Sequence, residues 1–426
     1  MKAAFYTLGC KVNQYDTQMM SEKLELSGFE IVSFEDLADV YVINTCTVTQ
    51  ISDKKSRNII SRARRRNPNS VIVVCGCFSQ VSPDEVKDIE GVDIVIGTSN
   101  RADILYYINS FLKSGNQIVD VSRHDNITNE NITTFSEKTR AILKIEDGCR
   151  NFCSYCLIPF ARGKIVSKPL DMVVNEAVAV AKNGYKEVVL TGIHLSSYGK
   201  DLNGVDLADA INKVSQIDEI KRIRLGSLEP MIITSGFVEK VRSNPKLCHS
   251  FHLSLQSGCD KTLSDMNRKY TSMQYKQAVD QLRLAFDDAA ITTDVIVGFP
   301  GESDEDFNES LNFVKNIGFA KVHIFPYSKR RGTKAATMPN QLTKEVKRKR
   351  ETLLSAVENQ TRTEFMQKMV GNDYEILVER CENNECVGFT KNYIQTKFVG
   401  ENSFCNTLMT VTVTSTDGIS LFGKIK

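Results

Sequence analysis

The chain has 426 residues, with 41% hydrophobic and 25% charged residues and a net charge of +2. These values are ordinary for a globular protein and exclude a disordered or fibrous chain, and the length predicts two to four domains. No apolar run approaches the roughly 20 residues of a membrane-spanning helix, and no signal-peptide pattern is present, so we expect a cytoplasmic protein with no membrane partner. The 12 cysteines indicate metal or redox chemistry in a reducing compartment.

Residues 1–115 alternate short apolar runs with helical patterns, which is typical of a parallel α/β sheet in a Rossmann-like domain. Residues 116–137 are rich in Asn, Thr, Ser and Asp and are predicted to be a linker. The expected strands are Ala3–Leu8, Val40–Asn44, Val71–Cys75 and Ile94–Ile96, and the expected helices lie near Gln14–Ser27, Ser52–Arg66, Pro83–Ile89 and Arg101–Leu112.

Residues 138–370 resume the alternation, and six strand–helix units predict a partial (β/α) barrel with its ligand chemistry at the C-terminal strand ends. Residues 331–370 read as basic and helical. Residues 371–426 show β-like alternation and predict a small β-barrel of the kind that binds oligonucleotides. The expected barrel strands are Ala141–Lys144, Glu187–Leu190, Arg222–Ser227, Phe251–Leu255, Ile291–Val297 and Lys321–Pro326.

The strongest single signal is the triplet Cys149, Cys153 and Cys156, which has the spacing C-x3-C-x2-C directly after a predicted strand. Three thiolates this close can bind three corners of one [4Fe–4S] cluster and leave the fourth iron open to a small molecule. The competing interpretations are a structural zinc site, which usually has four protein ligands, or three unrelated thiols.

A second cysteine set is dispersed. Cys10, Cys46 and Cys77 each follow a predicted strand of the N-terminal domain, and Cys75 belongs to a strand and is expected to be buried. The carboxyl ends of parallel strands meet at one edge of a sheet, so these three thiols can hold a second cluster with one open iron. The alternative is that they are small buried residues of the core.

Two kinds of motif carry a family resemblance. The C-x3-C-x2-C spacing after a barrel strand resembles the radical S-adenosylmethionine (SAM) superfamily. The segments Leu8–Thr17, Asn44–Val48 and Gly76–Gln80 resemble the N-terminal domain of the methylthiotransferases, and the tail is similar to a TRAM domain. The resemblance implies two [4Fe–4S] clusters, SAM as cofactor, and insertion of a CH3–S group into a C–H bond.

The residues that follow Cys10 narrow the resemblance to one branch of the family. Lys11–Gln14 reads Lys-Val-Asn-Gln, which is similar to the branch acting on N6-threonylcarbamoyladenosine at position 37 of tRNA. That implies tRNA, through its anticodon loop, and a flavodoxin or ferredoxin electron donor as partners. The alternatives are the branches acting on N6-isopentenyladenosine-37 or on a ribosomal-protein aspartate and, in another class, a non-catalytic metal-containing RNA-binding protein.

Residues of suitable type at the barrel strand ends are predicted to hold SAM, the alternative for each being strand capping or turn structure. Arg268 is expected to pair with the SAM carboxylate, and Tyr155 resembles the aromatic residue that the superfamily places over adenine. The strand-end set is Thr191 and Gly192 near the methionyl amine, Ser227 and Glu229 near the ribose, Gln256, and Asp294 and Gly298 near adenine.

Two basic clusters predict phosphate contacts, although each can also be a solvated helix face. Residues 53–66 hold 7 Lys or Arg against one Asp, and residues 329–350 hold 9 against one Glu. Cys381, Cys386 and Cys405 are expected to be plain thiols, and the five histidines are expected to form no ligand pair. The predicted RNA-binding residues are Lys347, Arg348, Lys349 and Arg350.

Overall fold

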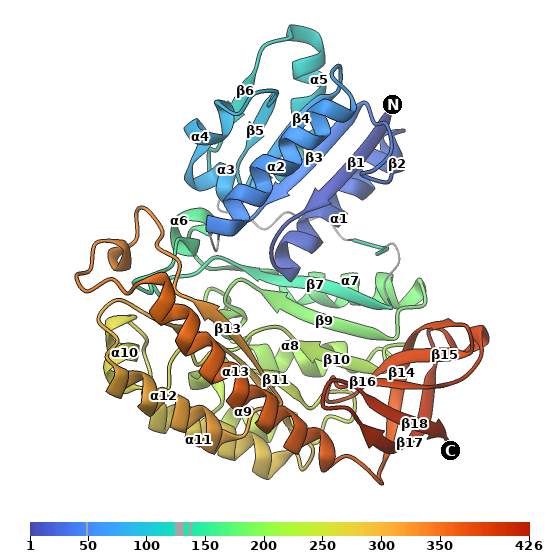
Figure 1. Ribbon diagram of the computed structural model, residues 1–426. Coiled ribbons are helices and arrows are strands. Elements are labelled where there is room, and N and C mark those ends of the chain that lie inside the picture. Colours follow the sequence, from blue (N-terminus) through green and yellow to red (C-terminus); the bar gives the residue numbers. More distant parts are fainter. Residues whose placement is uncertain (48–49, 124–131, 136–138) are drawn as a thin grey trace.

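A computed structural model describes residues 1–47, 50–123, 132–135 and 139–426, and the side chains of residues 50 and 51 are not described. Figure 1 shows three parts: an N-terminal α/β domain, a central barrel whose strands lie beneath it, and a small β-barrel at the C-terminal end. The predicted fold class, with a parallel α/β domain, a partial barrel and a closed β-barrel, is confirmed. Among the described residues, no helix is long and apolar enough to cross a membrane.

The N-terminal domain is a six-stranded parallel sheet in the order β2-β1-β3-β4-β5-β6. Every residue of its two central strands, β3 and β4, is buried, as expected for parallel strands that helices cover on both faces. The strands are β1 (Lys2–Thr7), β2 (Glu30–Val32), β3 (Val40–Thr45), β4 (Val71–Gly76), β5 (Ile94–Ile96) and β6 (Ile118–Asp120). The helices are α1 (Lys11–Leu26), α2 (Gln50–Arg66), α3 (Cys77–Val81), α4 (Pro83–Lys87) and α5 (Ile104–Ser114), preceded by the 3₁₀ turn η1 (Arg101–Asp103).

The predicted linker at 116–137 needs correction. Ile118–Asp120 forms β6, the edge strand of the N-terminal sheet, because its backbone pairs in parallel with β5. Ile132 and Phe135 are buried in the same core as the sheet and the central barrel. The segments 124–131 and 136–138 of the predicted linker lie outside the described residues.

The central barrel is open. Its strands run β10-β9-β7, with the short antiparallel β8 at one edge, and β11-β12-β13, and the parallel bridges Ile223–Leu247 and Leu228–Leu253 join the two sheets. The strands are β7 (Arg140–Asp147), β8 (Val166–Ser167), β9 (Glu187–Gly192), β10 (Arg222–Leu225), β11 (Ser250–His252), β12 (Ala290–Val297) and β13 (Lys321–Pro326). The strand predicted at Phe251–Leu255 is observed as β11 and ends at His252, so it is shorter than expected.

Helices surround this barrel, and several begin with the side-chain caps that the sequence carries, such as Asp206 with α8 and Ser303 with α12. The helices are α6 (Ile158–Arg162), α7 (Leu170–Lys182), α8 (Leu207–Val214), α9 (Ser235–Val241), α10 (Asp260–Asp265), α11 (Ser272–Ala285), α12 (Asp304–Ile317) and α13 (Lys344–Gln367). The 3₁₀ turns are η2 (Leu195–Ser197), η3 (Pro230–Ile232) and η4 (Lys334–Ala336).

The N-terminal domain and the central barrel share one apolar core, which runs from one face of the N-terminal sheet into the barrel. Buried polar contacts fix the joint. The Tyr15 hydroxyl on α1 donates to Glu176 Oε1 of α7 at 2.7 Å, and Lys168 Nζ donates to the other oxygen of the same carboxylate at 2.6 Å. The two domains are therefore packed against each other through a shared core and buried hydrogen bonds.

The C-terminal part is a closed barrel in the order β14-β15-β16-β18-β17, and Figure 1 shows it at the far end of α13. Its elements are β14 (Asp373–Glu382), β15 (Glu385–Thr390), β16 (Gln395–Val399), η5 (Asn402–Phe404), β17 (Leu408–Thr416) and β18 (Leu421–Ile425). Arg222 of β10 ties it to the central barrel by donating to the Glu375 carbonyl at 2.6 Å and the Phe389 carbonyl at 2.9 Å.

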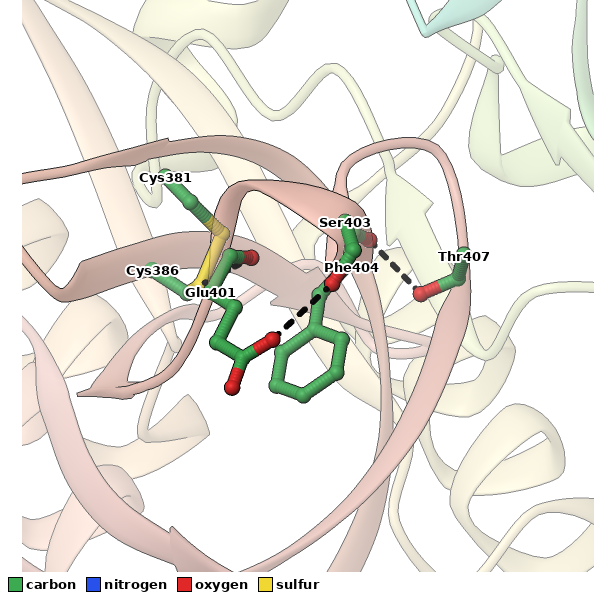
Figure 2. The surroundings of a disulfide bond; sticks show 6 residues. All are labelled: Cys381, Cys386, Glu401, Ser403, Phe404 and Thr407. Atoms are coloured by element: carbon green, nitrogen blue, oxygen red, sulfur yellow. Dashed lines mark hydrogen bonds between the residues drawn. A yellow bond between two sulfur atoms is a disulfide. The ribbon is translucent and has the colours of Figure 1, made fainter.

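The prediction of plain thiols in this barrel is wrong for two cysteines. Cys381 and Cys386 lie directly opposite each other in the β14–β15 hairpin and form a disulfide. Figure 2 shows this bond beside Phe404, whose carbonyl accepts from the Thr407 hydroxyl at 2.6 Å. Sequence spacing alone does not reveal this pairing, because it depends on the hairpin register. Cys405 is free and exposed, as expected.

Candidate active site

The first cysteine set lies in the loop between β7 and α6. Cys149, Cys153 and Cys156 are free and half-buried. Burial raises the pKa of Cys149 to about 11 and that of Cys156 to about 12, and the neighbouring cysteines add to both shifts. Such thiols keep their protons unless a metal takes the place of the proton, so the set fits a metal cluster.

Hydrogen-bond donors already point at these sulfurs. The backbone N–H of Asn151 lies 3.5 Å from Cys149 Sγ and that of Ile158 lies 3.4 Å from Cys156 Sγ. The Arg268 guanidinium lies 3.2 Å from Cys153 Sγ. Donors of this kind stabilise cluster-bound thiolates and tune the cluster potential, so the three residues fit one [4Fe–4S] cluster.

Arg268, predicted to pair with the SAM carboxylate, already has protein partners in the structure. Its second nitrogen donates to Glu229 Oε1 at 2.6 Å, and both side chains are largely buried. Burial alone would raise the Glu229 pKa, but His194 and Arg268 together lower it. The structure therefore assigns Arg268 to Cys153 and Glu229, and a SAM carboxylate would have to compete with Glu229 for it.

Glu146 is a buried carboxyl that the sequence patterns did not single out. It lies on β7 three residues before Cys149, is 0% exposed, and accepts from the His194 backbone N–H at 2.7 Å through Oε2, while Oε1 has no partner among the described residues. Burial raises its pKa well above the ordinary value. A Cβ added to Gly192 would lie 2.5 Å from Glu146 Oε2. An acidic residue inside the apolar β7 pattern was the available signal.

An unpartnered buried oxygen beside a glycine at a strand end fits an ammonium group. This is the place where we expected the methionyl amine of SAM, near Thr191 and Gly192. Glu146 and Gly192 thus fit the amino end of SAM. Glu146 would accept hydrogen bonds from the amino group, and Gly192 leaves free the space that a side chain would fill.

Two of the other predicted SAM residues line different cavities among the described residues. Glu229 lines a cavity of about 750 Å³ with Asn151 and His194, whereas Ser227 lines a separate one. Tyr155 packs edge-on against Phe299 with ring centroids 6.3 Å apart. The remaining residues are Thr191, which is buried; Gln256, which is buried with φ 70°; Asp294, which is half-buried; and Gly298, which has φ 71° and donates its N–H to Glu302.

The three cysteines of the second set each follow a strand of the N-terminal sheet, as predicted. Cys10 follows β1, Cys46 directly follows β3, and Cys77 begins α3 directly after β4. Cys46 and Cys77 are buried and Cys10 is exposed. A Cβ on Gly9 would lie 3.2 Å from Cys46 Sγ, and the Cys10 and Cys77 thiols interact electrostatically. Three cysteines at one sheet edge, none of them in a disulfide, fit a second cluster with one iron open.

A buried charge network backs this second set, and no sequence signal pointed to it. Arg162 of α6 donates to Asp16 at 3.1 Å, to Asp147 at 3.0 Å and to Asn13 at 2.6 Å, and it also interacts electrostatically with Cys10 and Cys77. Arg101 and Lys144 complete the network, so three cations face two carboxylates and one positive charge remains. That surplus favours thiolates at the second site.

A chamber of about 380 Å³ lies between the central barrel and the C-terminal barrel. Lys11, at the start of α1, reaches it from the N-terminal domain, and Arg224, Ser227 and Tyr393 form parts of its wall. Burial, followed by the nearby charges of Arg224 and Arg140, lowers the pKa of Lys11 to about 8. The chamber thus joins all three parts of the molecule beside the second cysteine set.

Two histidines form a group that we did not expect. His252 of β11 and His323 of β13 lie with Asp294 of β12, and their ligand atoms all lie within 4.8 Å of one another. His252 Nδ1 shares a hydrogen bond of 3.0 Å with the Thr292 hydroxyl. The prediction that the histidines form no pair is therefore wrong for these two, whose strands are adjacent in space but distant in sequence.

The basic clusters are only partly free. Arg350 is 4% exposed and pairs with Glu302 at 2.5 Å and Asp304 at 2.8 Å, so it is not available to an RNA phosphate. Lys347 donates to the Tyr327 carbonyl at 2.9 Å and lies over that ring. Arg348 and Lys349 are exposed. Spacing in sequence did not reveal that α13 packs its Arg350 face against α12.

A different basic surface is exposed near the first cysteine set. Arg330 pairs with Asp53 at 2.7 Å and so joins the loop after β13 to α2. Among the described residues, the exposed cations around this joint have no ion-pair partner. They are Lys54, Lys55, Lys329, Arg331 and Lys334.

Comparison with known proteins agrees with this geometry. Residues 2–97 match the uncharacterized protein family UPF0004, and residues 143–314 match the radical SAM superfamily. The threonylcarbamoyladenosine tRNA methylthiotransferase MtaB of Bacillus subtilis is 41% identical over 96% of this chain and 93% of its own length. The tRNA-2-methylthio-N(6)-dimethylallyladenosine synthase of Thermoanaerobacter pseudethanolicus is 34% identical over 98% and 91%.

A solved structure shows a similar fold. The radical S-adenosylmethionine methyltransferase TsrM from Kitasatospora setae superimposes with a TM-score of 0.55 at 15% identity, covering 79% of this chain and 77% of that one. At this identity the likeness concerns the fold alone.

Proposed function

Because the chain belongs to the family of radical SAM tRNA methylthiotransferases, we propose that it attaches a methylthio group to C2 of N6-threonylcarbamoyladenosine at position 37 of tRNA. The observation that carries this proposal is the pair of cysteine triads, one on the central barrel and one at the edge of the N-terminal sheet, in two domains that share one core. A flavodoxin or ferredoxin supplies electrons in this proposal.

The reaction itself explains why the site needs metal-binding thiols. The C2–H bond of adenine is neither acidic nor polarised, so general acid–base groups cannot activate it at neutral pH. Bound at the two triads, iron–sulfur clusters and SAM supply the one-electron and group-transfer chemistry that such a bond requires. The protein contributes the geometry and the electrostatics around them.

Individual residues have separate tasks in this proposal. Cys149, Cys153 and Cys156 would hold one cluster, and Arg268 orients Cys153 by donating to its sulfur. Glu146 accepts the ammonium group of SAM through its unpartnered Oε1. The cysteines at the edge of the N-terminal sheet would hold the second cluster, and Arg162 offsets its negative charge.

Exposed cations support tRNA as the substrate. Lys329, Arg331 and Lys334 lie on the loop that Arg330 fixes to α2, and Lys334 lines a cavity of about 270 Å³ together with Cys153 and Cys156. Phosphates bound there would bring the anticodon loop next to the first triad, and loop bases can be unstacked and presented to a pocket. Arg348 and Lys349 remain a second proposed phosphate surface.

The threonylcarbamoyl branch is favoured over the isopentenyl branch by the charge of the chamber. Lys11 places a cation inside it, and threonylcarbamoyladenosine carries a carboxylate that isopentenyladenosine lacks. The test is mass spectrometry of nucleosides from tRNA incubated anaerobically with the protein, SAM and a reductant. We expect the methylthio derivative of threonylcarbamoyladenosine; a methylthio derivative of isopentenyladenosine alone, or a modified ribosomal protein alone, would contradict the proposal.

A further inference from the structure

The chamber of about 380 Å³ holds an unbalanced positive charge. Among the described residues, the Lys11 ammonium group has no hydrogen-bond or ion-pair partner, although it lines both this chamber and an adjoining cavity of about 500 Å³. Arg224 and Tyr393 also line both cavities, so Lys11 lies where the two spaces meet.

The other cations that line the chamber are already in ion pairs. Arg224 Nε and Arg140 Nε both donate to Glu187 Oε1 at 2.7 Å, and Arg140 also pairs with Glu379. Elsewhere in the lining, Lys321 pairs with Glu358 at 3.3 Å, and Arg362 pairs with the same carboxylate at 3.0 Å. Lys11 is thus the cation of the described lining that remains available to a ligand.

The wall beside Lys11 is flat and held in place. Tyr393 stacks on Phe389 with ring centroids 4.8 Å apart, and the Arg224 guanidinium lies 4.3 Å from the Tyr393 ring centroid. Tyr393 adopts φ 70°, a left-handed conformation that persists where the surroundings enforce it. A rigid aromatic wall of this kind packs well against a planar group.

Hydrogen-bonding groups line the same space. Ser227 lies at the end of β10, and His252 and His323 are on adjacent strands of the barrel. The chamber therefore combines one cation without an ion-pair partner, a flat wall, and hydrogen-bonding side chains, all among the residues that the structure describes. An anion with a planar linker and a hydroxyl group matches that combination.

We propose that this chamber receives the N6 substituent of the target adenine, a planar urea that ends in an amino-acid carboxylate, and that the Lys11 ammonium pairs with that carboxylate. This inference rests on the proposed function and deepens it, because it assigns the recognition of the substituent to one residue. Lys11 is a specificity-determining residue here. It follows Cys10 directly in the chain, so recognition of the substituent is covalently linked to the second cysteine set.

The test removes the charge from either partner. Anticodon stem-loop RNAs carry threonylcarbamoyladenosine or its methyl ester, which keeps the shape and loses the carboxylate charge. Initial rates of methylthiolation at subsaturating RNA are compared for wild type, Lys11→Gln and Lys11→Arg, with Lys113→Gln, an exposed residue at the end of α5, as the matched control. Iron content and 5′-deoxyadenosine formation without RNA report on the clusters.

We expect wild type, Lys11→Arg and Lys113→Gln to prefer the free acid over the ester by about ten- to hundredfold, the range of one charge-assisted hydrogen bond. Lys11→Gln should use both RNAs at similar rates while its iron content stays at the wild-type level. If Lys11→Gln loses iron, the same rates are compared for Lys11→Met. The ratio of wild-type affinities for the acid and ester RNAs gives an independent measure of how strongly the carboxylate is recognised.

The outcomes separate the two proposals. A Lys11→Gln enzyme that keeps the full wild-type preference for the acid would overturn the role of Lys11 and leave the proposed function standing. A wild-type enzyme that methylthiolates isopentenyladenosine RNA and neither threonylcarbamoyl RNA would overturn the proposed function together with this inference.

Discussion

Arg224 Nε donates to Glu187 Oε1 at 2.7 Å, and neither side chain is more than 3% exposed. The same guanidinium lies over Tyr393 of the C-terminal barrel, and Glu187 also receives Arg140, which lies over Phe389 and Tyr393. One buried carboxylate thus positions the arginines that support the aromatic wall of the chamber. Removing it should affect stability in a pH-dependent way.

The first prediction concerns Glu187→Gln. Burial alone would raise the Glu187 pKa, but Arg224 and Arg140 outweigh it and hold the pKa at about 2. A depressed pKa stabilises the fold above the ordinary carboxyl pKa and loses that contribution as the pH falls toward 2. We expect Glu187→Gln to lower the free energy of unfolding at pH 7 by about 3–5 kcal/mol, because buried arginines lose their counter-charge.

The stability difference between wild type and Glu187→Gln should shrink by about 2 kcal/mol between pH 6 and pH 3, since wild-type Glu187 protonates in the same range in the unfolded chain. Urea unfolding of cluster-free protein measures it without interference from iron loss. Glu239→Gln, in an exposed pair with Arg242, is the control and should change stability by less than about 1 kcal/mol at every pH. A difference independent of pH would rule out the charged state of Glu187 as the cause.

The second prediction concerns Glu146→Gln. The substitution keeps the shape of the side chain and its contact with the His194 N–H. It removes the negative charge that the carboxyl would carry when the ammonium group of SAM binds beside it. We expect SAM affinity to fall by about ten- to hundredfold, with iron content unchanged. Equilibrium binding of SAM to the reconstituted protein measures this. Unchanged affinity would place the methionyl amine elsewhere.

The sequence predicted the fold well where a regular hydrophobic pattern is bounded by turn residues. The ranges Ile94–Ile96 and Lys321–Pro326 match the observed strands residue for residue, because each is a regular pattern bounded by turn residues. The placement of six cysteines after strands also followed from the alternation alone. The local sequence pattern was therefore sufficient to place these cysteines at the strand ends.

What the sequence missed depends on contacts between distant segments. Nothing near Arg162 in the chain indicates that it reaches Asp16, and nothing near Arg350 indicates that Glu302 buries it. His252 and His323 meet only because β11 and β13 flank β12. The edge strand β6 was hidden in a polar segment, since an edge strand needs little apolar sequence.

The third prediction concerns the exposed basic surface. Reversing two charges with Lys329→Glu and Arg331→Glu should weaken tRNA binding and reduce the slope of log K against log salt by about one for each cation–phosphate pair that no longer forms. Lys113→Glu with Lys213→Glu changes net charge equally on exposed residues elsewhere and is the control. An equal reduction in the control pair would mean that net charge, and not this surface, governs binding.

The most direct measurement is the iron content of anaerobically reconstituted protein in which one cysteine set at a time is replaced by alanine. Wild type should hold about eight iron atoms per chain. The Cys149, Cys153 and Cys156 variant should hold about four and form no 5′-deoxyadenosine, whereas the Cys10, Cys46 and Cys77 variant should also hold about four but still cleave SAM without methylthiolating tRNA. A wild type with about four iron atoms, or a triple variant that keeps the wild-type content, would contradict the two-cluster proposal.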